Sequence, residues 1–246
     1  MIPLKDRVAI ITGASHGIGR ATAVVLASRG TRLVCIGRDD NALHEVVERI
    51  VSDGGEAFCI HCDVHDEWSV KRTVEFVLDQ YGTIDILINN AGIGIQGQIE
   101  DYSLANWRIT LDTNLTGAFL FCRSVLPAMK AKKSGRIINV SSGAGRNGIA
   151  GYGAYCASKF GLIGLTESLA LEVRNDGIQV CSVLPGSTDT HFGGRTPEEE
   201  NAERSESVRL SPFEVAEAIA NLCESNPNAW ISELVIRPLA VKPRSL

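Results

Sequence analysis

The sequence predicts an α/β fold with a doubly wound, seven-stranded parallel sheet flanked by helices. Short β-branched segments alternate regularly with segments of helical period along the 246 residues. The strand segments are almost continuously apolar, which is typical of strands covered on both faces. Helices of ten or more residues between consecutive strands imply right-handed crossovers and parallel pairing. No linker or repeat interrupts the alternation, so we expect one domain over residues 1–246.

The individual elements follow from local composition and period. Strands are predicted at 7–12, 32–37, 57–64, 84–89, 136–140, 179–184 and 231–236. Helices are predicted at 17–29, 41–51, 67–81, 106–130 and 153–173. The polar stretch 187–211 is too long for an ordinary connection, so we expect a lid over a site; a surface excursion without that role is the alternative.

Composition and charge exclude several classes of protein. The net charge is −5, and lysines cluster only at Lys130, Lys132 and Lys133, so no basic face favours nucleic-acid binding. No apolar run approaches the roughly 18 residues of a membrane span, and the start of the sequence has no signal-peptide pattern. Seven cysteines, mostly within apolar runs, indicate buried thiols in a reducing compartment. We therefore expect a cytoplasmic protein that binds neither nucleic acid nor membrane.

A glycine-rich turn follows the first predicted strand, with the spacing Gly-x3-Gly-x-Gly over residues 13–19. Glycines let the backbone turn tightly and approach a pyrophosphate, which binds at the N-terminus of the following helix. At the first strand of a βαβ unit, this turn predicts a Rossmann dinucleotide site. The expected cradle residues are Gly13, Ser15, Gly17, Ile18 and Gly19.

The end of the second strand indicates which dinucleotide binds. It reads Ile36-Gly37-Arg38, without the carboxylate that NAD sites usually place there. Arg38 offers a charged planar fork for a 2′-phosphate, so NADP(H) is the predicted cofactor; a solvated surface arginine is the alternative. His16 is a second candidate contact for that phosphate, or else an exposed turn residue.

The order of motifs along the chain resembles the short-chain dehydrogenase/reductase family over essentially its whole length. The motifs are residues 12–19, Asp63-Val64, Asn89-Asn90-Ala91-Gly92, Asn114, Ser142, Tyr155-x3-Lys159 and Pro185-Gly186. The resemblance implies that Asp63 and Val64 border the adenine and that Asn90, Ala91 and Gly92 pass along the adenosine ribose. It also implies that Pro185, Gly186 and Thr188 meet the nicotinamide carboxamide, and that Tyr155 and Lys159 contact the cofactor.

Four residues form the predicted catalytic set. Tyr155 and Lys159 share one helix face, and an ammonium about 4 Å away would lower the pKa of the phenol by about three units, so that Tyr155 serves as acid/base. Ser142 can hydrogen-bond the substrate oxygen. Asn114 can bond a backbone carbonyl, or a water that links Lys159 to solvent. Each residue alone has an ordinary structural explanation, whereas the four together behind a dinucleotide turn indicate catalysis.

These residues predict an NADP(H)-dependent oxidoreductase that transfers a hydride between nicotinamide and a ketone, aldehyde or secondary alcohol. A 3-oxoacyl-acyl-carrier-protein reductase is the closest alternative; Asp176 and the non-glycine C-terminal segment 231–238 disfavour it. A non-catalytic NADP(H)-sensing protein is disfavoured by the complete catalytic set. Candidates for the substrate wall are Gly94, Ile95, Gly143, Ala144, Tyr152, Phe192 and the segment 187–211.

Two further features concern metals and assembly. Cys59 and Cys62 lie on the third predicted strand, where alternation sends them to opposite faces, so no metal site is expected. The helix 153–173 is apolar on nearly every side, and Gly161 and Gly164 would permit close helix approach. We therefore expect a homo-oligomer, a tetramer or a dimer, with helices 153–173 and 106–130 in the interface.

Overall fold

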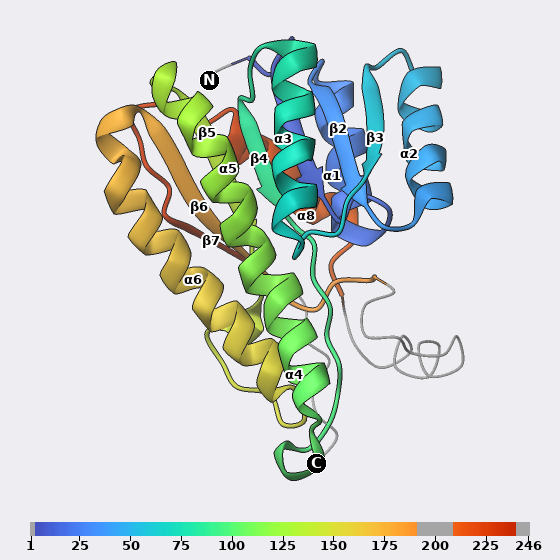
Figure 1. Cartoon of the computed structure of the whole chain (residues 1–246), viewed down its shortest axis with the longest axis vertical. Coiled ribbons are helices and arrows are strands. Elements are labelled where there is room, and N and C mark those ends of the chain that lie inside the picture. Colours follow the sequence, from blue (N-terminus) through green and yellow to red (C-terminus); the bar gives the residue numbers. More distant parts are fainter. Residues whose placement is uncertain (1–2, 191–208, 240–246) are drawn as a thin grey trace.

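The computed structural model describes residues 3–190 and 209–239 and contains the predicted parallel sheet (Figure 1). Its seven strands lie in the order β3-β2-β1-β4-β5-β6-β7, and every neighbouring pair is parallel. The order reverses between β1 and β4, and ligands of such sheets bind beyond the strand ends at this switch point. The strands are β1 Val8–Thr12, β2 Arg32–Gly37, β3 Ala57–His61, β4 Ile86–Asn89, β5 Gly135–Val140, β6 Ile178–Pro185 and β7 Glu233–Ile236.

Helices cover both faces of the sheet. One face packs against α1, α2 and α8, and the other against α3, α5 and α6, which stand in front of the strands in Figure 1. This arrangement explains why β1 is buried at all five positions and reads as continuously apolar. The helices are α1 Gly17–Ser28, α2 Asp40–Ser52, α3 Glu67–Tyr81, α4 Leu104–Leu111, α5 Gly117–Ala131, α6 Gly153–Val173 and α8 Pro212–Cys223.

Side-chain caps fix where several helices begin. The Asp39 carboxylate accepts from the Ala42 N–H at 3.1 Å at the start of α2, and Asp66 accepts from Trp68 at 3.0 Å at the start of α3. These contacts satisfy N–H groups that have no partner within the helix. We did not predict α8, although Ser211 and Glu214 form a capping box around Pro212 in its first turn.

The predicted helix 106–130 is wrong as a single regular α-helix. It consists of α4 and α5 joined by a π-helical turn, Asp112–Thr116. The wider turn contains Asn114, which is buried and bonded to a neighbouring loop instead of facing solvent. π-turns of this kind are frequent at functional sites.

Four predicted strands are shorter than expected, the first of them by one residue, since β1 begins at Val8. β3 ends at His61, β4 begins at Ile86 and β7 begins at Glu233. Asp85, just before β4, uses its carboxylate to accept from the Val8 N–H at 2.9 Å, so the chain is anchored there by a side chain before the ladder starts. The apolar character of a segment alone does not show where the hydrogen-bonded part of a strand begins or ends.

Both ends of the predicted lid segment 187–211 lie together. Leu210 donates its N–H to the Ser187 carbonyl and accepts from the Asp189 N–H, both at 2.8 Å. Residues 191–208 of this segment lie outside the described residues, as does Phe192 of the predicted substrate wall. Within residues 3–190 and 209–239, no helix has the length and apolar character of a membrane span.

Candidate active site

A cavity of about 1200 Å³ opens at the carboxyl ends of the strands, across the switch point between β1 and β4. It exceeds the roughly 300–1000 Å³ of a typical small-molecule pocket, which leaves room for a dinucleotide beside a substrate. Almost all of the predicted site residues line it; Gly19 and Asn114 lie behind its wall. The predicted residues on the wall are Gly13, Ser15, His16, Gly17, Ile18, Arg38, Asp63, Val64, Asn90, Ala91, Gly92, Ser142, Tyr155, Lys159, Pro185, Gly186 and Thr188.

The glycine turn is packed too closely for any side chain. A Cβ on Gly19 would lie 2.1 Å from the Gly13 carbonyl oxygen, and one on Gly13 would lie 2.8 Å from the Ala91 Cα. Gly13 also has φ +64°, a conformation that side chains rarely adopt. The Asn90 amide holds the turn by donating to the carbonyls of Thr12 and Gly13, each at 3.0 Å.

The first turn of α1 borders the same cavity. His16 is its N-cap residue and makes no side-chain capping bond, so the first N–H groups of the helix receive no side-chain acceptor from it. A Cβ on Gly17 would lie 3.0 Å from the Thr190 methyl, so this side of the turn is narrow. The cradle therefore fits a phosphate group that approaches the bare backbone.

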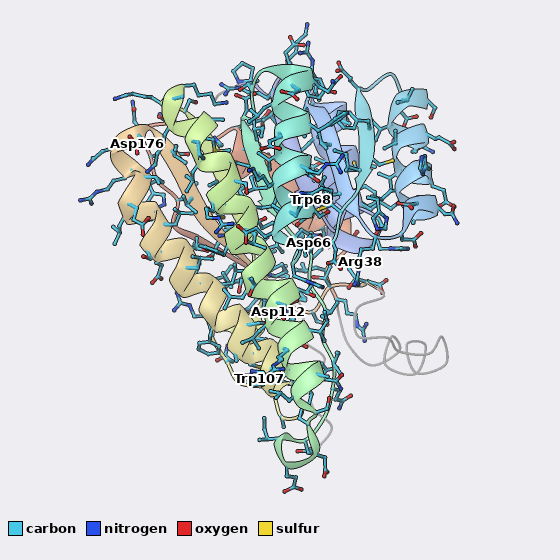
Figure 2. The ribbon with its side chains drawn as sticks, viewed as in Figure 1. Arg38, Asp66, Trp68, Trp107, Asp112 and Asp176 are labelled. Carbon is cyan, nitrogen blue, oxygen red and sulfur yellow. The ribbon has the colours of Figure 1, made fainter. Side chains whose placement is uncertain are left out.

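Arg38 lies beyond the carboxyl end of β2 and is exposed on the cavity wall (Figure 2). No hydrogen bond or ion pair engages its guanidinium within the described parts of the chain. The neighbouring Asp39 caps α2 and lies 3.9 Å from His16 Nε2. The carboxylate closest in sequence is thus already engaged, while the arginine is available to an anion.

Tyr155 and Lys159 lie on α6 beside the loop that follows β5. Lys159 Nζ donates to the Val140 carbonyl at 2.9 Å and lies 5.8 Å from the centroid of the Tyr155 ring. Tyr155 forms a side-chain hydrogen bond with Ser142. Ser142 Oγ also accepts from the Ala144 N–H at 3.1 Å, which fixes the serine at the cavity wall. A hydroxyl pair and a cation therefore meet at one place in the cavity.

The expected lowering of the pKa of Tyr155 by Lys159 is wrong in this structure. Burial raises the pKa of the Tyr155 phenol above its ordinary value of 10, and the hydrogen bond with Ser142 opposes that rise. Burial also lowers the pKa of Lys159 to about 8. Contact at about 4 Å in a polar medium would favour the phenolate, whereas desolvation dominates the pKa of both groups in this structure.

Asn114 holds the backbone beside the predicted cofactor channel. Its amide accepts from the Ile93 N–H at 2.8 Å and donates to the Ile93 carbonyl and Ser158 Oγ, each at 2.9 Å. Of the two predicted roles, the backbone-carbonyl bond is confirmed. A Cβ on Gly92 would lie 3.3 Å from Asn114 Oδ1 and 3.4 Å from Lys159 Nζ, so Gly92 separates these two groups.

The family is decided by comparison with known proteins. The family model described as short chain dehydrogenase matches residues 7–201. The chain belongs to the short-chain dehydrogenase family.

Relatives of this short-chain dehydrogenase include reductases and dehydrogenases. A 3-oxoacyl-[acyl-carrier-protein] reductase of Synechocystis sp. is 40% identical over 187 residues, 76% of each chain. A cyclohexanol dehydrogenase of Acinetobacter sp. is 36% identical over 226 residues, which are 89% of this chain and 88% of the relative. A solved metagenomic short-chain oxidoreductase in complex with NADP has a TM-score of 0.85 and 37% identity, and the match covers 97% of this chain and 99% of that one.

The substrate end of this short-chain dehydrogenase's cavity is only partly as predicted. Gly143, Ala144 and Tyr152 line it, whereas the described wall does not include Gly94 and Ile95. Several wall residues were not predicted from the sequence, among them Ile93, Asn147, Ile149 and Arg237. Arg237 directly follows β7, so the rule that ligands bind at the carboxyl ends of parallel strands could have found it.

Two arguments made from the sequence need correction. Cys62 lies beyond the end of β3, so strand alternation does not determine where it points relative to Cys59. In the described parts of the chain, no group of three or more candidate ligands is arranged for a metal. Leu115 of the same chain fills the space at Gly161, where a Cβ would lie 2.8 Å from the leucine side chain. Of the two glycines predicted to permit close helix approach, Gly164 alone faces open space.

Proposed function

We propose that this short-chain dehydrogenase reduces the carbonyl group of a small or medium-sized ketone or aldehyde with NADPH, and that Tyr155 donates the proton. The observation that carries the proposal is the half-buried Ser142–Tyr155 hydroxyl pair on the cavity wall, with the buried Lys159 ammonium behind it. A phenol whose pKa lies above 10 holds its proton at neutral pH, as a donor to a developing alkoxide must.

The residues of the chain divide the work at the carbonyl oxygen. Ser142 hydrogen-bonds that oxygen and stabilises the charge that develops on it. Tyr155 transfers its proton to the same oxygen, and the Lys159 ammonium stabilises the negative charge that grows on the phenol. The bound nicotinamide coenzyme supplies the hydride to the carbonyl carbon and accepts it in the reverse direction. In that direction Tyr155 must first lose its proton, which the raised pKa makes harder.

The glycine cradle supports the proposed coenzyme site. Gly13, Gly17 and Gly19, with Ser15 and Ile18, would hold the pyrophosphate against α1. By family resemblance, Asp63 and Val64 would border the adenine, and residues 90–92 the adenosine ribose. Pro185, Gly186 and Thr188 would contact the carboxamide, and Tyr155 and Lys159 the cofactor as well. Asn114 would position Ile93 and the segment before it.

The preference for NADP(H) over NAD(H) is part of this proposal. The unengaged guanidinium of Arg38 on the wall and His16 beside it support a 2′-phosphate site. The similar metagenomic oxidoreductase, solved in complex with NADP, supports it independently.

Organisation and location are proposed on separate grounds. One sheet with both faces covered supports a single domain over residues 1–246, and the paired ends at Thr188 and Leu210 support a lid at 187–211. The exposed apolar side chains Phe119, Phe160 and Leu171 on α5 and α6 support a homo-oligomer, a tetramer or dimer. Seven free thiols support the cytoplasm.

Reduction of a 3-oxoacyl group on a carrier protein is the second candidate. It is favoured by the 40% identity to a reductase of that kind. Asp176 (Figure 2) no longer disfavours this candidate, because it precedes β6. Pro185, at the opposite end of β6, lies on the cavity wall. Asp176 instead lies 3.8 Å from the Lys130 ammonium.

A substrate panel tests the proposal. Simple ketones, aldehydes and β-keto thioesters are offered with NADPH or NADH, and coenzyme absorbance is followed for the wild type and Tyr155→Phe. We expect the wild type to oxidise NADPH in the presence of ketones or aldehydes, and we expect Tyr155→Phe to lose this activity. Exclusive turnover of β-keto thioesters would favour the carrier-protein reductase. Tight NADPH binding without any turnover would favour a sensor.

A further inference from the structure

The cavity has a cation that the proposed chemistry does not use. Arg237 follows β7, is exposed, and lines the cavity that holds Ser142 and Tyr155. In the parts of the chain that the structure describes, its guanidinium has no hydrogen bond or ion pair. Glu233, earlier on the same strand segment, is held by Arg146 at 2.7 Å. The positive charge of Arg237 is therefore not neutralised by its own strand.

Backbone contacts fix Arg237 at the edge of the cavity. The Gly186 N–H donates to the carbonyl of Ile236, the residue before Arg237, at 2.7 Å. A Cβ on Gly186 would lie 3.5 Å from the Arg237 Cα, so the two backbones are in close contact. The arginine therefore starts from a defined position beside the Pro185–Gly186 segment of the cavity wall.

The sheet order places Arg237 near the catalytic end of the cavity and far from the phosphate cradle. β7 is two strands from β5, after which Ser142 lies, so their ends are about 10 Å apart at about 4.8 Å per strand. The cradle follows β1, four strands from β7, and Arg38 follows β2, five strands away; these offsets are about 19 and 24 Å. Arg237 is thus farther from a coenzyme phosphate in the glycine cradle than from the strand end that precedes Ser142.

The charges on the described wall are unevenly distributed. Its two carboxylates, Asp39 and Asp63, follow β2 and β3. Asp39 caps α2, and Asp63 lies 3.2 Å from His65 Nε2. No carboxylate of the described wall lies at the β7 end, where Arg237 stands. A planar guanidinium in such a place suits a carboxylate, which it can bind with two parallel hydrogen bonds.

We propose that Arg237 is a specificity-determining residue that binds the carboxylate of an oxo-acid substrate whose carbonyl group lies several bonds away, at Ser142 and Tyr155. This inference rests on the proposed carbonyl reduction and adds the class of substrate to it. The arginine takes no part in proton transfer; it orients the substrate and favours anionic over neutral ketones.

The test compares matched acids and esters. 4-Oxopentanoate and 5-oxohexanoate, with their methyl esters, are reduced with NADPH by the wild type and by Arg237→Gln and Arg237→Lys. We expect the wild type to prefer the acids. The acid-to-ester ratio of kcat/KM should fall about 10- to 100-fold in Arg237→Gln, the range expected for a charged hydrogen bond, and less in Arg237→Lys, which keeps the charge but loses the fork.

Control measurements separate the explanations. Arg38→Gln, at the far end of the cavity, should raise the KM for NADPH and leave the acid-to-ester ratio as in the wild type. If Arg237→Gln instead raises the KM for NADPH and leaves that ratio unchanged, the arginine serves the coenzyme and the proposal is overturned. Equal turnover of acids and esters by the wild type would also overturn it, with the carbonyl reductase function intact. Absence of turnover with every ketone would mark failure of the proposed function itself.

Discussion

The Lys159 ammonium donates a hydrogen bond to the carbonyl oxygen of Val140, at 2.9 Å, and so connects α6 to the last residue of β5. Ser142 follows Val140 by two residues, and Tyr155 lies one helical turn before Lys159. This buried hydrogen bond therefore fixes the position of the Lys159 ammonium. It also fixes α6, which carries Tyr155, relative to the end of β5, after which Ser142 lies.

Removing the Tyr155 hydroxyl should abolish proton transfer. We expect Tyr155→Phe to lower kcat for ketone reduction by about 10²- to 10⁴-fold, the usual contribution of a general acid. NADPH affinity, measured by fluorescence titration, should change little, because the ring remains. Retention of wild-type kcat would show that another group supplies the proton.

The pH dependence should differ between the two directions. Lys159 has a pKa of about 8, so its charge is present below pH 8 and is lost above it. Because that charge stabilises the developing phenolate, reduction should be constant near neutrality and fall above about pH 8. Alcohol oxidation should instead rise with pH, since the raised pKa of Tyr155 leaves little phenolate at pH 7. Steady-state kcat/KM from pH 6 to 10 in both directions checks this. A reduction profile that stays flat through pH 10 would contradict the assigned role of Lys159.

Lys159 should reduce the stability of the fold. Its pKa is lower in the folded chain than the ordinary 10.5, so the charged form is disfavoured by folding, fully so below pH 8. Lys159→Met should raise the free energy of unfolding by about 1–3 kcal/mol at pH 7, less than the full cost of desolvating the ammonium, because the hydrogen bond to Val140 is lost. The gain should shrink as pH rises from about 8 to 10.5. Urea unfolding measures it, and Lys71→Met on exposed α3 is the control that should show no gain.

Arg38 should determine coenzyme choice. Replacing it by aspartate removes the fork for the 2′-phosphate and supplies an acceptor for ribose hydroxyls. We expect Arg38→Asp to shift the NADPH-to-NADH ratio of kcat/KM by about 100-fold toward NADH. Arg49→Asp, on the exposed side of α2, makes the same change in net charge and should leave the ratio alone. If Arg38→Asp and Arg49→Asp had equal NADPH-to-NADH ratios of kcat/KM, Arg38 would not bind the 2′-phosphate.

The exposed apolar face of α6 should mediate self-association. Phe160 and Leu171 are 46% and 56% exposed, and Gly164 between them faces open space. Glutamates at positions 160 and 171 would place charges in the interface, so Phe160→Glu with Leu171→Glu should yield a smaller species in sedimentation velocity at micromolar concentration. Val51→Glu on α2 is a control at a similarly exposed apolar residue. A wild type that sediments as a monomer would refute the interface.

Local sequence predicted much of the cavity, since its main parts are strand ends and turns. Gly13 and Gly19 are identifiable because only glycine tolerates the contacts with Ala91 and the Gly13 carbonyl. Asn114 was found as a residue, but its π-turn was not, because the turn depends on bonds to Ile93 in a distant loop. Arg237 was missed because its neighbours in the cavity are far away in the sequence.

The sequence by itself determined the alternation of strands and helices, the glycine turn, and the candidates for the catalytic residues, because period, spacing and side-chain chemistry are local properties. Only the tertiary structure decided the protonation preferences of Tyr155 and Lys159 and the place of Arg237. Burial depends on everything that packs around a group, and desolvation here outweighs the pairwise attraction that a four-residue spacing suggests. Strand order, likewise, is fixed by packing of the whole sheet, and it alone brings the end of β7 to the catalytic end of the cavity.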